Sequence, residues 1–217
     1  MTKKQQSLNV LSSEEQDIFQ EIMNIGFGSA AADLAGVIDI HVKLSIATIT
    51  VIPSVDLVDY IKEIMPDVHE ISIIEQNFWS KFQGTAMLTF TSGAGRALLG
   101  LMGSMNEEQT FESDPMHTLE KEMLMEIGNI LTGACVGKVA ELLGDYVVYS
   151  PPRVLIGTIE NANVSKMVSD HRNFATVLQT VFHFGEQDLK GCLLLIVSHE
   201  SITWLRQALQ NFLGQYK

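Results

Sequence analysis

Two stretches of the sequence carry the same polar residues at the same spacing, and both read Glu-Ile-x-Asn-Ile at their centre. Each set has a carboxylate, a glutamate and an asparagine at positions i, i+4 and i+7: Asp17, Glu21 and Asn24, then Glu122, Glu126 and Asn129. On an α-helix these positions lie within an arc of about 60°. Each set therefore forms one polar line along a helix, and its repetition is harder to attribute to chance than a single copy.

A carboxylate and a carboxamide one helical turn apart can position a reactant. The glutamate can accept hydrogen bonds from a cation, while the asparagine amide both donates and accepts, which suits it to holding a water. Neither group is an activated nucleophile, and no Ser/His/Asp or Cys/His set accompanies them. The alternative is that the acidic residues are simply solvated and the asparagines exposed or locally bonded. The repetition favours a function, although both lines could also be inherited remnants of one ancestral surface.

Apolar and small residues flank the two polar lines. We expect an apolar line to anchor each helix, through Ile18, Ile22 and Ile25 in the first and Met123, Ile127 and Ile130 in the second. The small residues include Gly26, Gly28, Gly128, Gly133 and Gly137. No strand-GxGxxG-helix order surrounds them, so close packing of the helices is favoured over a phosphate-binding loop.

The elements that position these residues follow from hydrophobic periodicity. Ser12 and Glu15 have the spacing of a capping box, so the first helix is predicted to begin at Ser12 or Ser13 and to stop at Gly36. Alternation and β-branched residues then predict a strand ended by Pro53. The remaining elements of this half are a short helix, two strands and another short helix, at about 55–65, 70–78, 82–90 and 94–101.

The second half repeats this order after a polar linker at 103–113. Asp114-Pro115 begins a long helix that ends at Gly144. The following elements are a strand at 146–159 interrupted by Pro151-Pro152, a short helix at 161–168, strands at 174–184 and 189–197, and a helix at 199–213.

The spacing of landmarks supports an internal duplication. Asn24 and Asn129 are 129 − 24 = 105 residues apart, and Gly84 and Gly191 are 191 − 84 = 107 apart. The predicted fold class is α/β, of the α+β kind: duplicated α-β-α-β-β-α halves, related by a pseudo-two-fold axis, share one sheet and two long helices carry the sites. The chain, 1–217, is expected to be one domain of two repeats, about 12–102 and 114–215.

Composition narrows the function classes. A net charge of −12 leaves no basic field for nucleic acid or a membrane surface, and no uninterrupted apolar run approaches the roughly 18–20 residues of a spanning helix. No apolar signal region follows the N-terminal residues, so we expect a cytoplasmic protein. Cys135 and Cys192 are expected to be reduced core thiols, and the histidines have no metal-ligand spacing, so no metal or cofactor bound by this chain is expected.

The polar lines resemble the signature of the CheC/CheX/FliY phosphatases of bacterial chemotaxis. That signature is Asp or Ser, three residues, Glu, two residues, Asn, then 22 residues and Pro. The second half matches it at Glu126 and Asn129 and has Pro152 at 129 + 23 = 152, but it has Glu122 where Asp or Ser is usual.

The first half matches the three polar residues but has Ala47, at 24 + 23 = 47, where proline is usual. Ser45 and Ser150 also correspond between the halves. The resemblance covers nearly the whole chain, and its two-copy layout is similar to CheC rather than to the shorter CheX.

The resemblance implies a hydrolase that removes the phosphoryl group from the aspartate of a CheY-type response regulator. It implies that Asn24 and Asn129 orient the attacking water, that Glu21 and Glu126 pair with the receiver's lysine, and that Mg²⁺ is held by the receiver. Asp17, Glu122 and Pro152 are the supporting residues. Because Ala47 leaves the backbone φ angle free, we expect the second site to be the better catalyst.

Two other functions stay open. One is a non-catalytic module that binds a receiver or a CheD-like partner, or a scaffold of the flagellar switch. The other is small-molecule sensing between the halves, which no ligand signature supports. The protein could be a monomer or a homodimer, because one chain carries both sites and an exposed strand edge could pair.

Overall fold

The computed structural model describes residues 11–38, 42–44, 48–64, 71–91, 93–101, 114–157, 174–184, 189–197 and 199–214. The helices are α1 (Ser13–Ile38), η1 (Ser54–Asp56), α2 (Leu57–Ile64), α3 (Ala94–Leu101), α4 (Asp114–Leu142) and α6 (His199–Gly214). The strands are β1 (Val42–Leu44), β2 (Thr48–Pro53), β3 (Ile71–Trp79), β4 (Gly84–Thr91), β5 (Val148–Tyr149), β6 (Arg153–Gly157), β7 (Phe174–Phe184) and β8 (Leu189–Val197).

The strands form one sheet that both halves of the chain share. Its order is β1-β7-β8-β4-β3-β5, with β2 also paired to β7 and β6 to β3. The pairings among the described strands are antiparallel. The second-half strand β7 thus pairs with the first strand of the first half, and β3 pairs with the first strand of the second half. The predicted mixed fold with a shared sheet is confirmed.

The register at the centre of the sheet is consistent with a pseudo-two-fold axis. In the β4–β8 pair, Met87 lies opposite Leu194, and 194 − 87 = 107 is also the offset between Gly84 and Gly191. The duplication itself stays a prediction. The proposed linker at 103–113 and the short helix at 161–168 lie outside the described residues.

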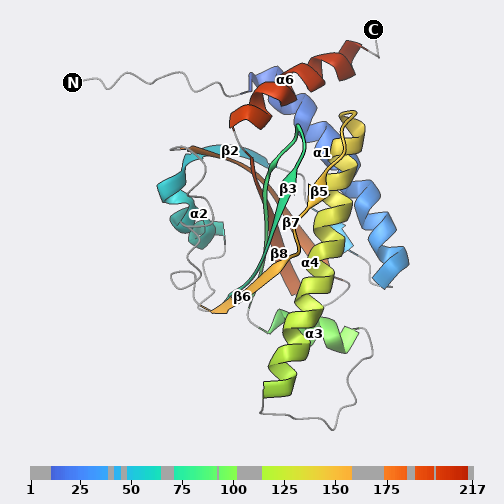
Figure 1. The fold of residues 1–217 in the computed structure, drawn as a ribbon, viewed down its shortest axis with the longest axis vertical. Helices are drawn as coiled ribbons and strands as arrows, with labels where there is room; N and C mark the ends of the chain where they lie inside the picture. Colours follow the sequence, from blue (N-terminus) through green and yellow to red (C-terminus); the bar gives the residue numbers. More distant parts are fainter. Residues whose placement is uncertain are drawn as a thin grey trace, which may run out of the picture.

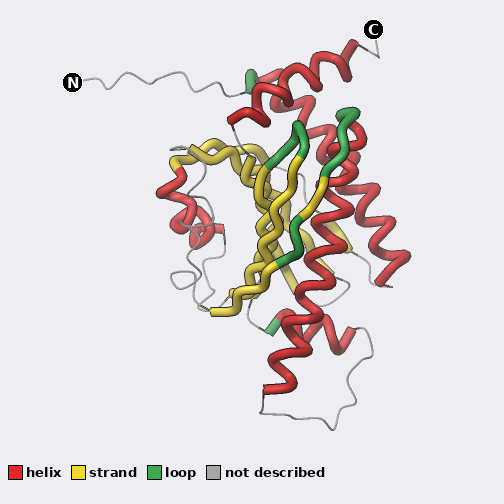
Figure 2. The backbone as a smooth tube through the Cα atoms, viewed as in Figure 1, coloured by secondary structure: helices red, strands yellow, loops and turns green. Residues whose placement is uncertain are grey.

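The long helices cover one face of the sheet. Figure 1 shows α1 and α4 side by side and running in opposite directions, while α2 lies against the other face. The layers are easily seen in Figure 2, where the strands lie between these helices. Each face has its own apolar core: α1, α3, α4 and α6 pack on the first with side chains such as Ile74 and Leu195, whereas Leu57 and Ile61 of α2 pack on the second.

The buried face of α1 differs in part from the predicted anchor line. Ile22 is buried as expected, but Ile25 is 48% exposed and Met23 is fully buried. The reason is that α1 packs against α4 as well as against the sheet: a Cβ added at Gly26 would lie 3.1 Å from Val139 Cγ2 of α4. The prediction for Ile25 was therefore wrong, because two contact surfaces bury a stripe shifted away from that residue.

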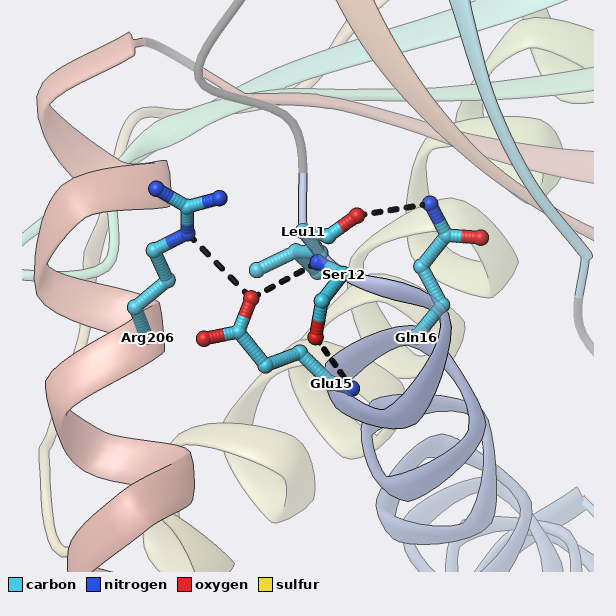
Figure 3. A network of polar contacts seen from close by, with 5 residues as sticks. All are labelled: Leu11, Ser12, Glu15, Gln16 and Arg206. Atoms are coloured by element: carbon cyan, nitrogen blue, oxygen red, sulfur yellow. Dashed lines mark hydrogen bonds and ion pairs between the residues drawn. The ribbon is translucent and has the colours of Figure 1, made fainter.

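The N-terminus of α1 has the predicted capping box, shown in Figure 3. The Ser12 backbone N–H donates to Glu15 Oε2 at 2.7 Å, and the Glu15 N–H donates to Ser12 Oγ at 3.2 Å. The same Glu15 oxygen lies 3.3 Å from Nε of Arg206 on α6. One glutamate therefore caps α1 and ties it to α6.

Most element bounds agree with the sequence predictions. Strands β7 and β8 have the predicted bounds, and α6 ends one residue later than predicted. The largest difference lies after α1, which continues past Gly36 to Ile38, so the following strand begins only at Val42.

One described helix has the dimensions of a membrane span. Residues Thr118–Leu142 of α4 are long and apolar enough, but half of their most apolar window is buried inside the protein. A core helix passes the same test, so this is weak evidence for a membrane segment.

Candidate functional site

Both polar lines lie on helix faces that solvent reaches. Asp17 and Glu21 are exposed and Asn24 is half-buried on α1, and the three residues of α4 are all exposed: Glu122, Glu126 and Asn129. Within each helix the buried side chains point to the sheet or to the other helix, which turns these lines outward. The structure therefore leaves both glutamate–asparagine pairs accessible to a macromolecular partner.

The two pairs make two separate sites. Gly26, two residues after Asn24, packs against Val139. From Asn129 to Val139 is 139 − 129 = 10 residues, which span about 15 Å along a helix. No single ligand group can contact both asparagines at that separation.

A break between β5 and β6 lies beside Asn129. The segment Ser150-Pro151-Pro152 interrupts the strand, because proline has no N–H to donate to a neighbouring strand. Ser150 closes the gap instead: its N–H donates to the Asn77 carbonyl at 2.9 Å, and its Oγ accepts from the Asn77 N–H at 3.0 Å. Pro152, the expected supporting residue, therefore lies in the break that borders the second site.

Gln76 of β3 connects this break to Asn129. Its Nε2 donates to Asn129 Oδ1 at 2.9 Å and to the backbone carbonyl of Ser150, also at 2.9 Å. The Gln76 side chain is almost fully buried, at 2% exposure, while Asn129 is exposed. The buried carboxamide of Gln76 thus donates a hydrogen bond to the exposed carboxamide of Asn129 from the side of the sheet.

The donors and acceptors of this chain set the orientation of both amides. A backbone carbonyl can only accept, so the atom of Gln76 that faces Ser150 must be the Nε2 donor. That same Nε2 faces Asn129, which therefore presents its Oδ1 to the sheet and directs its Nδ2 donors elsewhere. One lone pair of Oδ1 stays available for a further hydrogen bond.

Tyr149 of β5 contacts α4 at the turns that follow Asn129. The Tyr149 hydroxyl donates to the Gly133 carbonyl at 3.4 Å and would lie 3.3 Å from a Cβ at Gly137. Burial, with a smaller contribution from Cys135, raises the pKa of Tyr149 well above its ordinary value, so the phenol keeps the proton it donates. The helical turns after Asn129 are therefore in contact with the strand that precedes the break.

The glycines of the two helices have different roles. Gly128 fits the close-packing prediction, since an added Cβ would lie 2.5 Å from Ile74 Cγ2 of β3. Gly28 and Gly133 do not, because none of the described atoms lies within 4 Å of a Cβ at either position. For these two the packing prediction was wrong, because the side of the helix on which each Cβ would lie has no packing partner among the described residues.

The first site is described less fully. Glu21 and Asn24 belong to α1, but Ser45 and Ala47, which the resemblance places beside them, lie outside the described residues. The structure therefore shows Asn129 beside its strand break. The residues of the first site that correspond to this break are not among those described.

Sequence reasoning missed Gln76. In the strand run Ser72-x-Ile74-x-Gln76-x-Phe78, the glutamine shares the face of Ile74 and Phe78, which belong to the core. A long polar side chain on the inward face of a strand was the available signal. Its partner could not be read from the sequence, because Asn129 is 129 − 76 = 53 residues away.

Comparison with known proteins points to one group of chemotaxis and flagellar proteins. The sequence is 26% identical over 162 residues to the flagellar motor switch phosphatase FliY of Bacillus subtilis. That match covers 74% of this chain and 40% of the relative, so the chain spans less than half of that protein's length. No model of a known protein family matches the sequence.

Solved structures share the fold. The crystal structure of Thermotoga maritima FliY has a TM-score of 0.71 at 20% identity, over 94% of this chain and 99% of that chain. The FliM middle domain of Helicobacter pylori has a TM-score of 0.56 at 14% identity, over 91% and 99%. A chain of the Borrelia burgdorferi CheX-CheY-BeF3-Mg complex has a TM-score of 0.52 at 13% identity, over 80% and 96%.

The finer likeness to two-site CheC stays a prediction, since these relatives are FliY, FliM and a CheX complex. The sequence match to FliY, and the fold shared with FliY and CheX, support a likeness of this chain to the CheC/CheX/FliY family.

Proposed function

We propose that this protein is a phosphatase for the aspartyl phosphate of a CheY-type response regulator. The observation that carries the proposal is the exposed Glu126–Asn129 pair, whose asparagine amide is held by Gln76 in one orientation. The phosphatase name of the Bacillus subtilis relative and the CheX–CheY complex among the structures of similar fold agree with it.

The reaction needs positioning more than covalent chemistry. Asn129 and, in the first site, Asn24 accept a hydrogen bond from a water and direct its lone pair at phosphorus, opposite the aspartate oxygen. The water oxygen bonds to phosphorus, the bond from phosphorus to the aspartate oxygen breaks, and the products are aspartate and inorganic phosphate, with the water proton passing to solvent or phosphate.

The glutamates would hold the receiver in place. Glu21 and Glu126 are exposed carboxylates one turn from their asparagines, where each can pair with the active-site lysine of a receiver. Mg²⁺ would belong to the receiver, where it neutralises the phosphoryl oxygens. This division gives this chain no cofactor of its own and is consistent with a cytoplasmic location.

A second function has a specific observation in its favour. The FliM middle domain shares the fold, which leaves room for a non-catalytic scaffold of the flagellar switch or a module that binds a receiver or a CheD-like protein. The two proposals differ at the asparagines: a docking surface does not need a carboxamide at both sites, whereas water positioning does.

The test is the decay of a phosphorylated CheY-type receiver with and without this protein. We expect faster decay, lost in the Asn24→Ala/Asn129→Ala double variant and kept in Asn211→Ala, which removes an exposed helical asparagine of α6. Binding of several receivers without any acceleration would refute the phosphatase and favour the scaffold.

A further inference from the structure

We propose that Gln76 is a positioning residue of the second site, which sets the orientation of the Asn129 carboxamide for the water it holds. The inference rests on the proposed phosphatase function. It concerns a residue of β3, in the other half of the chain from Asn129, and outside the polar lines.

The first argument is geometric. An exposed asparagine on a helix can rotate about its side-chain bonds, which swaps the positions of Oδ1 and Nδ2. Without a fixed hydrogen bond, the side chain therefore presents a mixture of carboxamide orientations. The hydrogen bond from Gln76 Nε2 removes this freedom, because the Ser150 carbonyl in turn decides which end of Gln76 faces the asparagine. Asn129 is thereby organised before a receiver binds, which lowers the entropy lost on reaching the reactive geometry.

The second argument is the unfavourable burial of Gln76 itself. Both hydrogens of Nε2 are used, and the buried Oε1 has no hydrogen-bond partner among the described residues. A buried acceptor left unsatisfied destabilises a fold. An apolar side chain of similar length would fill the same volume without that oxygen, so fold stability alone does not explain a glutamine here.

The third argument is that the sheet has a threonine, not a second glutamine, at the position that corresponds to Gln76. Gln76 lies opposite Ala86 in the β3–β4 pair, and the corresponding pair in β7–β8 is Thr180 opposite Leu193, since 193 − 86 = 107. Threonine has no carboxamide. Among the described strands, the register therefore has no carboxamide at the position that corresponds to Gln76 beside the first site.

The experiment compares Gln76→Met with a matched control, Gln179→Met. Methionine keeps the length of glutamine but has no N–H donor. Gln179 of β7 is also a hydrogen-bonded strand glutamine, but its Oε1 accepts from the Tyr60 hydroxyl at 2.6 Å, on the face covered by α2. Both variants are measured in an Asn24→Ala background, so that only the second site turns over.

In that background we expect Gln76→Met to lower kcat for receiver dephosphorylation about tenfold, with unchanged affinity for a BeF3-loaded receiver, and Gln179→Met to leave kcat unchanged. A second comparison uses Asn129→Ala in a chain that keeps Asn24. Adding Gln76→Met to this variant should not lower its remaining rate of receiver dephosphorylation. If Gln76→Met fails to fold, Gln76→Thr, which brings in the residue type of the corresponding position in β7, serves in its place.

Three results would overturn the inference: an unchanged kcat in the Gln76 variant, an equal loss in the control, or a further loss in the Asn129→Ala chain. The wild-type protein is measured first. If it accelerates no receiver, the proposed function is refuted and the inference falls with it; if it does and the Gln76 variant equals it, only the inference is refuted.

Discussion

At the scale of residues, the two candidate sites share their chemistry but not their surroundings. Each has an exposed glutamate one turn before an asparagine. Asn129 is held by Gln76 next to a strand break that contains Pro152, whereas the first site has Ala47 and, from β7, Thr180 at the corresponding positions. A difference in catalytic strength should follow from these neighbours, because the asparagines themselves are identical.

Single alanine variants test this difference. We expect Asn129→Ala to lower the rate of receiver dephosphorylation more than Asn24→Ala, with a loss at the affected site of about 100-fold, typical of a misplaced reactant. The measurement is single-turnover decay of a phosphorylated receiver by each variant. A larger loss from Asn24→Ala would show that the first site dominates.

At the scale of elements, the approach of α4 to β3 sets the height of Asn129 above the sheet. The residue before it is Gly128, whose missing Cβ lets the helix backbone rest against Ile74. The branched side chain of Ile74 has little freedom to move aside. The position of the helix and the position of Asn129 are therefore coupled through one glycine.

Two glycine variants of α4 make a matched pair. Gly128→Ala should lower the free energy of unfolding by about 1–3 kcal/mol through overpacking, and it should also lower activity by moving Asn129. Gly133→Ala should raise the free energy of unfolding by up to about 1 kcal/mol, because the new methyl group meets open space and favours the helix. Urea denaturation of both variants checks this, and equal effects would contradict the described packing.

The capping box gives a second test at this scale. Ser12→Ala removes the acceptor for the Glu15 N–H and should lower the free energy of unfolding by about 1 kcal/mol. Ser13→Ala, one residue later and exposed, is the control and should have little effect. Thermal or urea denaturation measures both, and an unchanged midpoint for Ser12→Ala would show that the cap does not stabilise α1.

At the scale of the whole molecule, one sheet carries a core on each face. Cys135 lies in the core beneath the long helices and Cys192 in the core beneath α2, and both are free thiols. Burial raises the pKa of each thiol to about 12. The prediction of reduced core cysteines is confirmed, and the two residues can report on the two faces independently.

Thiol labelling with a disulfide reagent at pH 8 should therefore be negligible in the folded protein, because the thiolate is the reactive form. Both thiols should become reactive in the same denaturant transition if the sheet unfolds as one unit; two transitions would show that its faces unfold separately.

Since the folded pKa values of the two cysteines exceed the roughly 8.5 of an unfolded cysteine, the free energy of unfolding should fall as pH rises from about 8.5 toward 12. Equilibrium unfolding as a function of pH measures this slope.

Hydrophobic periodicity and the residues typical of helix and strand ends were sufficient to predict most elements and the two polar lines from the sequence. Strands β7 and β8, the capping box at Ser12 and the break at the two prolines could be predicted because each depends on residues close together in the chain. The outward direction of Glu126 and Asn129 follows from the same local geometry.

Tertiary structure alone decided the rest. Which stripe of α1 is buried depended on α4 as well as on the sheet, so Met23 is inside and Ile25 is not. The contact of Gln76 with Asn129 exists only because β3 of one half pairs with β5 and β6 of the other and lies under α4. Sequence patterns report on neighbours within a few residues, whereas the orientation of the Asn129 amide depends on side chains that folding brings together from distant parts of the chain.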